Sequence, residues 1–83
     1  MHHSEDDTFR VSAVTLGTTI AKWRTSAMMT QQRLSNSSGI SQGMISYIER
    51  DLRPGVSLAT VAALAHALHC TVDDLVQCRM PPP

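Results

Sequence analysis

The sequence is poor in aromatic residues and cysteine, and it has no long apolar run. Its 83 residues include one Phe, one Trp and one Tyr, so a core must be built mainly from aliphatic side chains. No apolar stretch approaches the roughly 20 residues that cross a bilayer, and the acidic N-terminal stretch does not look like a signal peptide. These absences favour a cytoplasmic protein.

The two cysteines, Cys70 and Cys78, are too few for a disulfide scaffold. The sequence contains no Cys-x-x-Cys pair and no array of ligands with zinc-finger spacing. No nucleophile–base pair, carboxylate dyad or phosphate-cradling glycine loop stands out either. We therefore predict that the chain is not an enzyme and that it has no metal site and no cofactor.

The net charge of the chain is zero, but the charges are unevenly distributed. Residues 1–15 carry a net charge of −2 and residues 54–83 carry −1, whereas residues 16–53 carry +3. The central excess comes from five cations: Lys22, Arg24, Arg33, Arg50 and Arg53. A local basic face of this kind is compatible with nucleic-acid binding, although the whole chain is neutral.

Hydrophobic spacing predicts five helices and no strand. The first helix is expected to begin at Thr15 or Leu16 and to end near Ala27, because its apolar positions recur with the 4-3-4 spacing of one helical face. Trp23 belongs to this face, with its indole edge expected near the surface. Residues 1–14 have no such periodicity and are interpreted as a flexible N-terminal arm.

Residues 31–38 and 42–50 form the next two predicted helices, joined by a turn at Gly39. Thr30 and Ser41 are the expected N-caps, because a side-chain hydroxyl can accept a hydrogen bond from a free N–H of the first turn. Gly39 suits the turn because glycine adopts a positive φ without steric strain.

The helix predicted at residues 42–50 has one apolar and one polar face. The apolar face carries Ile45, Ile48 and Leu52. The opposite face is polar, and it carries Gly43, Ser46, Tyr47 and Arg50, with Gln42 beside them in the first turn. A helix, a tight turn and a second helix with a polar outer face is the arrangement that presents a helix to the major groove of DNA.

The last third of the chain contributes two more predicted helices. Ser57 caps a strongly amphipathic helix that ends near His69. Thr71 caps a short helix from 72 to 77, and residues 78–83, which end in three prolines, are expected to form an extended tail. The predicted architecture is all-α, with a compact five-helix domain over residues 15–77.

The chain resembles the five-helix DNA-binding domains of the phage-repressor and Xre class, the lambda-repressor-like family. The resemblance covers residues 15–76 and rests on the combined spacing of Leu16-Gly17, Arg24, Gln31, Leu34, Gly39, Ile45, Ser46, Ile48-Glu49, Pro54, Leu58 and Leu68. It implies a helix-turn-helix in the second and third helices and double-stranded DNA as the partner.

The resemblance also implies roles for individual residues. Arg24 and Glu49 match a structural ion pair that ties the first helix to the third. Gln31 matches a glutamine that hydrogen-bonds a DNA phosphate. Arg50 and Arg53 match the loop that lies along the phosphate backbone.

The base-contacting positions of the family fall on Gln42, Gly43 and Tyr47, flanked by Met44 and Ser46. Gln42 can pair with adenine N6 and N7 through two hydrogen bonds. Tyr47 can meet a thymine methyl group, a base edge or a phosphate. Gly43 ranks below these two as a contact, because a glycine in the first turn of a helix can simply be tolerated.

Three helix ends at which the family often has glycine carry Met28, Asp51 and His69 in this chain. Asp and His tolerate the left-handed conformation better than most residues, so two of the three are understandable. Methionine does not, and we expect the turn after the first helix to be built differently.

Two other interpretations are weighed against DNA binding. His66 and Cys70 share a helix face near His69, but Cys70 matches a buried valine-like position of the family, which argues against a metal site. The same fold also serves as a protein-interaction module in antitoxins and coactivators. Residues 1–14 and the segment from Gln77 leave little room for a separate binding region, so DNA binding is favoured.

We predict a transcriptional repressor that binds a pseudo-palindromic operator as a homodimer, with another regulatory protein as a further candidate partner. One small domain of modest charge would bind weakly, whereas two copies can place their recognition helices in successive major grooves about 34 Å apart. The dimer interface is expected at Leu75 and Val76, because the last helix has more apolar surface than one small core needs.

Overall fold

The computed structural model describes residues 14–53 and 55–83. The predicted arm, residues 1–14, lies outside the described residues except for Val14. The described residues form five helices and no strand: α2 (Leu16–Ser26), α3 (Gln31–Ser38), α4 (Gln42–Glu49), α5 (Leu58–Leu68) and α6 (Val72–Val76). The predicted all-α fold is confirmed.

A side-chain hydroxyl begins every helix. Each capping oxygen accepts a hydrogen bond from the backbone N–H three residues later, which satisfies one of the free donors of the first turn. The caps are Thr15, Thr30, Ser41, Ser57 and Thr71. The helix starts predicted from these residues therefore agree with the structure. Arg50 and Gln77, predicted as the last helical residues, are instead the C-caps of α4 and α6.

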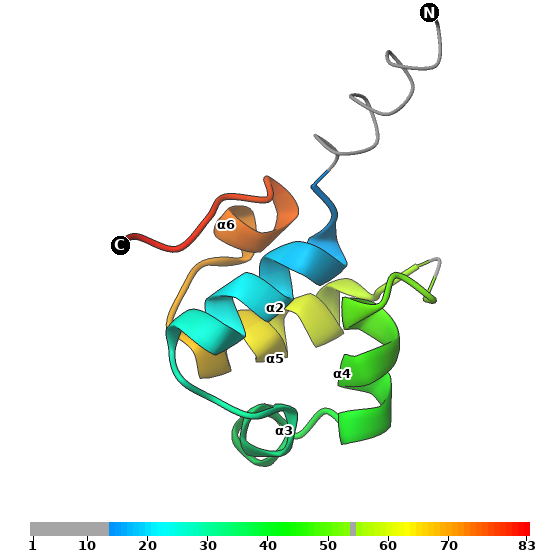
Figure 1. Cartoon of the computed structure of the whole chain (residues 1–83). Helices are drawn as coiled ribbons and strands as arrows, with labels where there is room; N and C mark the ends of the chain where they lie inside the picture. Colours follow the sequence, from blue (N-terminus) through cyan, green and yellow to red (C-terminus); the bar gives the residue numbers. More distant parts are fainter. Residues whose placement is uncertain (1–13, 54) are drawn as a thin grey trace, which may run out of the picture.

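α2 and α5 lie in the middle of the molecule, with α3 and α4 on one side and α6 on the other (Figure 1). Side chains from all five helices meet between them. The buried apolar side chains are Ile20, Leu34, Ile45, Ile48, Val61, Leu64, Ala65, Ala67, Leu68 and Leu75. All are aliphatic, as the scarcity of aromatic residues requires, and their removal from water is the main favourable term in folding.

Leu52 does not share the buried face of α4, which corrects the sequence interpretation. Its side chain is 54% exposed, whereas Ile45 and Ile48 are buried. The helix ends at Glu49, and Asp51 has a φ of 59°, so the chain leaves the helical path before it reaches Leu52.

α2 crosses the C-terminal end of α4 at Gly17. A Cβ atom there would overlap the Ile48 carbonyl oxygen and would lie 2.6 Å from Asp51 Oδ1. Asp51 is also held by Thr15, whose hydroxyl donates to Asp51 Oδ2 at 3.1 Å. Glycine at position 17 therefore sets how closely the two helices approach.

Four of the described helices end in a turn where a residue other than glycine has a positive φ, and after α6 this residue is Cys78, with a φ of 54°. Met28, Asp51 and His69 all have a φ of 59°, so the turn after α2 uses the same left-handed conformation as the other two. The expectation of a different turn at Met28 was wrong. The Met28 N–H donates to the Thr25 carbonyl and the next N–H donates to the Arg24 carbonyl, and these bonds close the turn despite its steric cost.

Trp23 joins α2 to the C-terminal segment. Its half-buried ring packs against the core, and its Nε1–H donates to the Arg79 carbonyl oxygen at 2.8 Å. The Arg79 N–H donates to the Asp74 carbonyl oxygen, and its guanidinium donates to Asp73 Oδ2 at 2.6 Å. The segment predicted as an extended tail thus begins folded back against α6, and residues 79–83 have no regular secondary structure.

The apolar side chains of α6 lie in different environments, and half-buried Val72 packs against the core. Leu75 is fully buried in the core, whereas Val76 is 57% exposed. A side chain enclosed by its own protomer cannot lie at a surface between two copies. The dimer interface expected at Leu75 and Val76 is therefore corrected: Leu75 is a core residue, and only Val76 is accessible.

Arg24 and Glu49 form the ion pair that the resemblance implied. Arg24 Nε lies 2.7 Å from Glu49 Oε2, and Arg24 Nη2 lies 3.0 Å from Glu49 Oε1. Arg24 Nη1 donates to the Met29 carbonyl oxygen at 2.8 Å, and Gln31 Nε2 donates to Glu49 Oε1 at 3.0 Å. The hydrogen bonds from Arg24 to Glu49 raise the pKa of the guanidinium above its ordinary value. One cluster therefore joins α2, the following turn, α3 and α4.

Replacement of Met28 by glycine should stabilise the fold. The side chain is 91% exposed, so little contact is lost, while relief of the left-handed strain contributes up to about 1 kcal/mol. We expect Met28→Gly to raise the melting temperature by a few degrees. Met28→Ala removes the same side chain but keeps the strain, so its melting temperature should stay at or below that of the wild type. Equal effects of the two variants would contradict the assignment of strain.

Loss of Arg24 should destabilise the fold. Arg24→Ala leaves the Glu49 carboxylate, which is 6% exposed, with Gln31 as its remaining partner, and we expect a cost of about 2–3 kcal/mol in the free energy of unfolding. Urea denaturation measures this quantity. Lys22→Ala removes an exposed cation from the same helix and should change it by less than about 0.5 kcal/mol. Similar stabilities of the two variants would show that the ion pair does not hold α4.

Candidate nucleic-acid interface

The outer face of α4 is exposed along its whole length. Gln42, Gly43, Tyr47 and Arg50 are exposed, and Tyr47 is 52% exposed despite its large ring. Met44 and Ser46, which flank them, are half-buried. The residues that the sequence singled out on this helix thus share one accessible surface.

Local interactions position this surface. Gly39, with a φ of 79°, ends α3, and the Ser41 hydroxyl begins α4 by accepting the Met44 N–H at 3.1 Å. Ile45 and Ile48 anchor the inner face of the helix in the core. The two helices therefore meet at a fixed turn, with the polar side chains of α4 directed outward.

Gln31 lies at the start of α3 and is half-buried. Its amide nitrogen donates to Glu49 Oε1 at 3.0 Å, so the side chain is held by the Arg24–Glu49 cluster. A glutamine amide has two hydrogens, and the second can be donated to another acceptor. Gln31 is thus oriented by the ion pair, while its amide keeps a second N–H that can donate elsewhere.

Arg50 and Tyr47 form a contact at the end of α4. The Arg50 guanidinium carbon lies 5.7 Å from the centre of the Tyr47 ring, within the range of a cation–π interaction. Arg50 Nε also donates to the Ser46 carbonyl oxygen, although the bond is long at 3.4 Å. The contact places a positive charge at one edge of the outer face.

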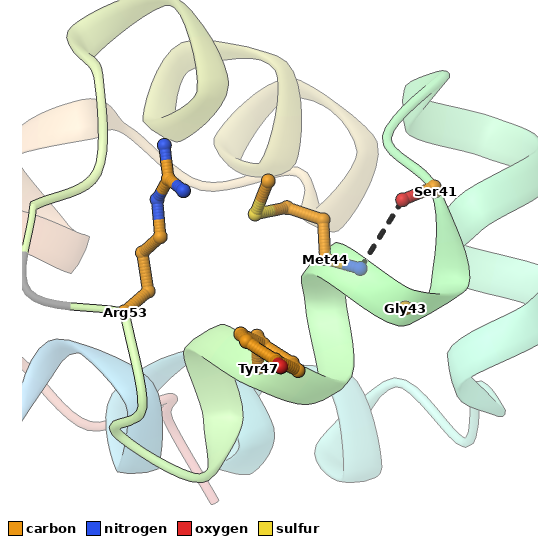
Figure 2. Close-up of a pocket in the computed structure, with 5 residues that line it drawn as sticks. All are labelled: Ser41, Gly43, Met44, Tyr47 and Arg53. Atoms are coloured by element: carbon orange, nitrogen blue, oxygen red, sulfur yellow. Dashed lines mark hydrogen bonds between the residues drawn. The ribbon is translucent and has the colours of Figure 1, made fainter.

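Arg53 faces α4 from the loop that follows it. Its Nε donates to the Gly55 carbonyl oxygen at 3.0 Å, which fixes the base of the guanidinium. Together with Ser41, Gly43, Met44 and Tyr47, it lines a cleft of about 350 Å³ (Figure 2). No sequence pattern predicted this cleft, because it forms between a helix and a loop whose path depends on the turn at Asp51.

The described acidic residues do not oppose these cations on the outer face. Glu49 is bound by Arg24, and Asp51 accepts a hydrogen bond from Thr15. The other two, Asp73 and Asp74, lie on α6, on the far side of α2 and α5 from α4, and Arg79 bridges them. The distribution of charge therefore favours an anionic partner on the side of α3 and α4.

The histidine and cysteine residues do not form a metal site in the described part of the chain. Within these residues, no three His, Cys, Asp or Glu side chains come close enough together to hold a metal ion. Burial, with a smaller contribution from the Asp74 carboxylate, raises the pKa of the Cys70 thiol to about 11. The thiol is therefore protonated at neutral pH.

None of the helices in residues 14–53 and 55–83 has the length and hydropathy needed to cross a membrane.

Comparison with known proteins agrees with this arrangement. The helix-turn-helix family matches residues 20–75, which is more than half of the chain. Among solved structures, the chain is similar to SinR, the master regulator for biofilm formation, in a crystal structure of its complex with DNA. The TM-score is 0.72 at 22% sequence identity, over 75% of this chain and 98% of the SinR chain. No curated protein matches the sequence significantly.

At this identity, the likeness to SinR shows a shared fold, whereas the family match identifies the kind of domain. The matched range contains α3, the turn at Gly39 and α4, which are the two helices and the turn that the family name describes. The chain belongs to the helix-turn-helix family of the Xre and lambda-repressor type, a family of DNA-binding transcription regulators.

Proposed function

We propose that this protein is a sequence-specific transcriptional repressor that inserts α4 into the major groove of operator DNA. The observation that carries the proposal is the outer face of α4: exposed, polar, rimmed by arginines, and fixed to the rest of the fold through Glu49. The DNA bound to SinR in its crystal structure supports the same partner for this chain.

The side chains on α4 suit the edges of base pairs. Gln42 sits in the exposed first turn and can donate and accept two hydrogen bonds with adenine. Tyr47 adds a ring and a hydroxyl one turn later, and Ser46 offers a small hydroxyl between them. Gln31, Arg50 and Arg53 surround this surface with donors that suit phosphate oxygens.

A homodimer on a pseudo-palindromic site is part of the proposal. One copy of this domain offers few base contacts, and a second copy would place an identical α4 in the next major groove, about 34 Å away. With Leu75 buried and Val72 half-buried, Val76 is the most exposed apolar side chain of α6 and the one that we propose for contact with a second copy. A compact dimer over a promoter would block polymerase without further parts, which is why repression is proposed.

Selection of bound duplexes from a random pool tests the function directly. We expect enrichment of a motif with two-fold symmetry and half-sites about one helical turn apart. Enrichment of a single half-site would overturn the homodimer while leaving sequence-specific binding. Absence of any enrichment would reject the DNA-binding proposal and would favour a protein-interaction role for the same fold.

Removal of a base-contacting side chain should relax the sequence preference. We expect Gln42→Ala and Tyr47→Ala each to cost about 1–3 kcal/mol on the selected site and to lose discrimination at one position of each half-site. Competition binding against single-base variants of the site measures both effects. Gln77→Ala, an exposed glutamine beside α6, should change neither quantity. An unchanged preference in both α4 variants would refute their role as base contacts.

Removal of Arg53 should weaken binding to all sequences alike. Each phosphate contact contributes about 0.9 to the slope of log K against log salt concentration, so Arg53→Ala should flatten this slope by about 1 per protomer. A titration of affinity against salt on the selected site and on unrelated DNA checks this. Arg79→Ala removes a cation on the α6 side and should leave the slope unaltered. Equal slopes for wild type and Arg53→Ala would remove Arg53 from the interface.

A further inference from the structure

The cleft on the outer face of α4 has apolar walls and a cationic rim. Met44 contributes a thioether, Tyr47 contributes its ring, and Gly43 lines the cleft without a side chain. Figure 2 shows Met44 and Arg53 facing one another across the cleft, with the Tyr47 ring along its lower edge. An apolar hollow next to an arginine, on the helix proposed to enter the major groove, suits an occupant that has an apolar group beside a negative charge.

Gly43 is not required by the fold. A Cβ atom at this position would have no protein atom within 4 Å, in contrast to the overlap at Gly17. Gly43 does not have a positive φ either, so its backbone does not need glycine. A glycine that neither packing nor backbone conformation demands leaves the surface of α4 open for close approach by something outside the chain.

Thymine in DNA is chemically complementary to this cleft. It is the only one of the four standard bases with an apolar group, its 5-methyl, on the major-groove edge. The phosphate beside such a base carries the negative charge that complements Arg53. The cleft, at about 350 Å³, is larger than one methyl group, and it can hold the methyl edge of the base together with part of the adjoining sugar.

We propose that the cleft formed by Gly43, Met44 and Tyr47 binds the 5-methyl group of a thymine, with the Arg53 guanidinium on the neighbouring phosphate. This inference rests on the proposed function, since it requires α4 in the major groove. It goes further by assigning one base and one atom to a set of residues. Gly43 becomes a specificity-determining residue because it has no side chain.

The first test removes only the methyl group. Each thymine of the selected duplex is replaced in turn by deoxyuridine, which keeps every hydrogen-bonding group of the base. Burial of one methyl group corresponds to about a fourfold change in affinity, so one position of each half-site should show about this loss. Substitution at both symmetric positions should lower the affinity about fifteenfold.

The second test adds a methyl group to the lining of the cleft at Gly43. Gly43→Ala should raise the melting temperature by a few degrees, because alanine is the better helix former and meets no atom of the protein. The added methyl group would occupy the place of the thymine methyl. We therefore expect at least a fourfold loss of affinity for the thymine duplex, and binding to the deoxyuridine duplex at least as tight as to the thymine duplex.

Gly55→Ala is the matched control. A Cβ atom there also meets nothing within 4 Å, but Gly55 does not line the cleft. Gly55→Ala should therefore show the same loss of affinity on deoxyuridine substitution as the wild type. If Gly43→Ala also keeps the full loss, the cleft is not where the methyl group lies.

The outcomes separate this inference from the function on which it rests. A selected site that tolerates deoxyuridine at every position would overturn the thymine cleft and would leave sequence-specific binding intact. Tighter binding when a cytosine of the site is replaced by 5-methylcytosine, without a deoxyuridine effect, would overturn thymine in favour of the methylated base. Absence of any selected site would reject both proposals.

Discussion

The buried carboxylate of Glu49 is the constraint on which the arrangement of the helix-turn-helix depends. A carboxylate that is almost fully removed from water needs several well-aligned hydrogen bonds. Here the donors are Arg24 on α2 and Gln31 on α3. Arg24 also binds the Met29 carbonyl, so the turn between those helices is included. The same cluster neutralises the single acid of α4, which leaves the outer face of that helix without an opposing charge.

Glycine is favoured in this chain at two kinds of position, for different physical reasons. At Met28, Asp51 and His69 the hydrogen bonds of the turn impose a positive φ on residues that bear its steric cost. At Gly17 the backbone is ordinary, and the requirement for glycine comes from the neighbouring carbonyl oxygen of α4. The first kind of position tolerates a side chain at a modest loss of stability, whereas the second does not tolerate any side chain without separating α2 from α4.

The features that could be predicted from the sequence are those that depend on residues close together in the chain. Helix starts follow from hydroxyl caps such as Thr30 and Ser41, and the turn at Gly39 follows from the freedom of glycine. The Arg24–Glu49 pair is separated by 25 positions and was expected only through the resemblance to a family. The exposure of Leu52, the burial of Leu75 and the cleft beside Tyr47 depend on where the chain turns and which helices pack together, and no local pattern encodes these.

The bond between the Trp23 indole and the Arg79 carbonyl has an optical consequence. Trp23 is the single tryptophan of the chain, so its emission comes from one place, where α2 meets the C-terminal segment. Detachment of that segment would expose the indole edge to solvent and remove its hydrogen-bond acceptor, while α4 on the opposite side of the fold would be untouched. The tryptophan fluorescence of this protein therefore reports docking of its C-terminal segment, whereas the tyrosine fluorescence reports on α4, which carries Tyr47.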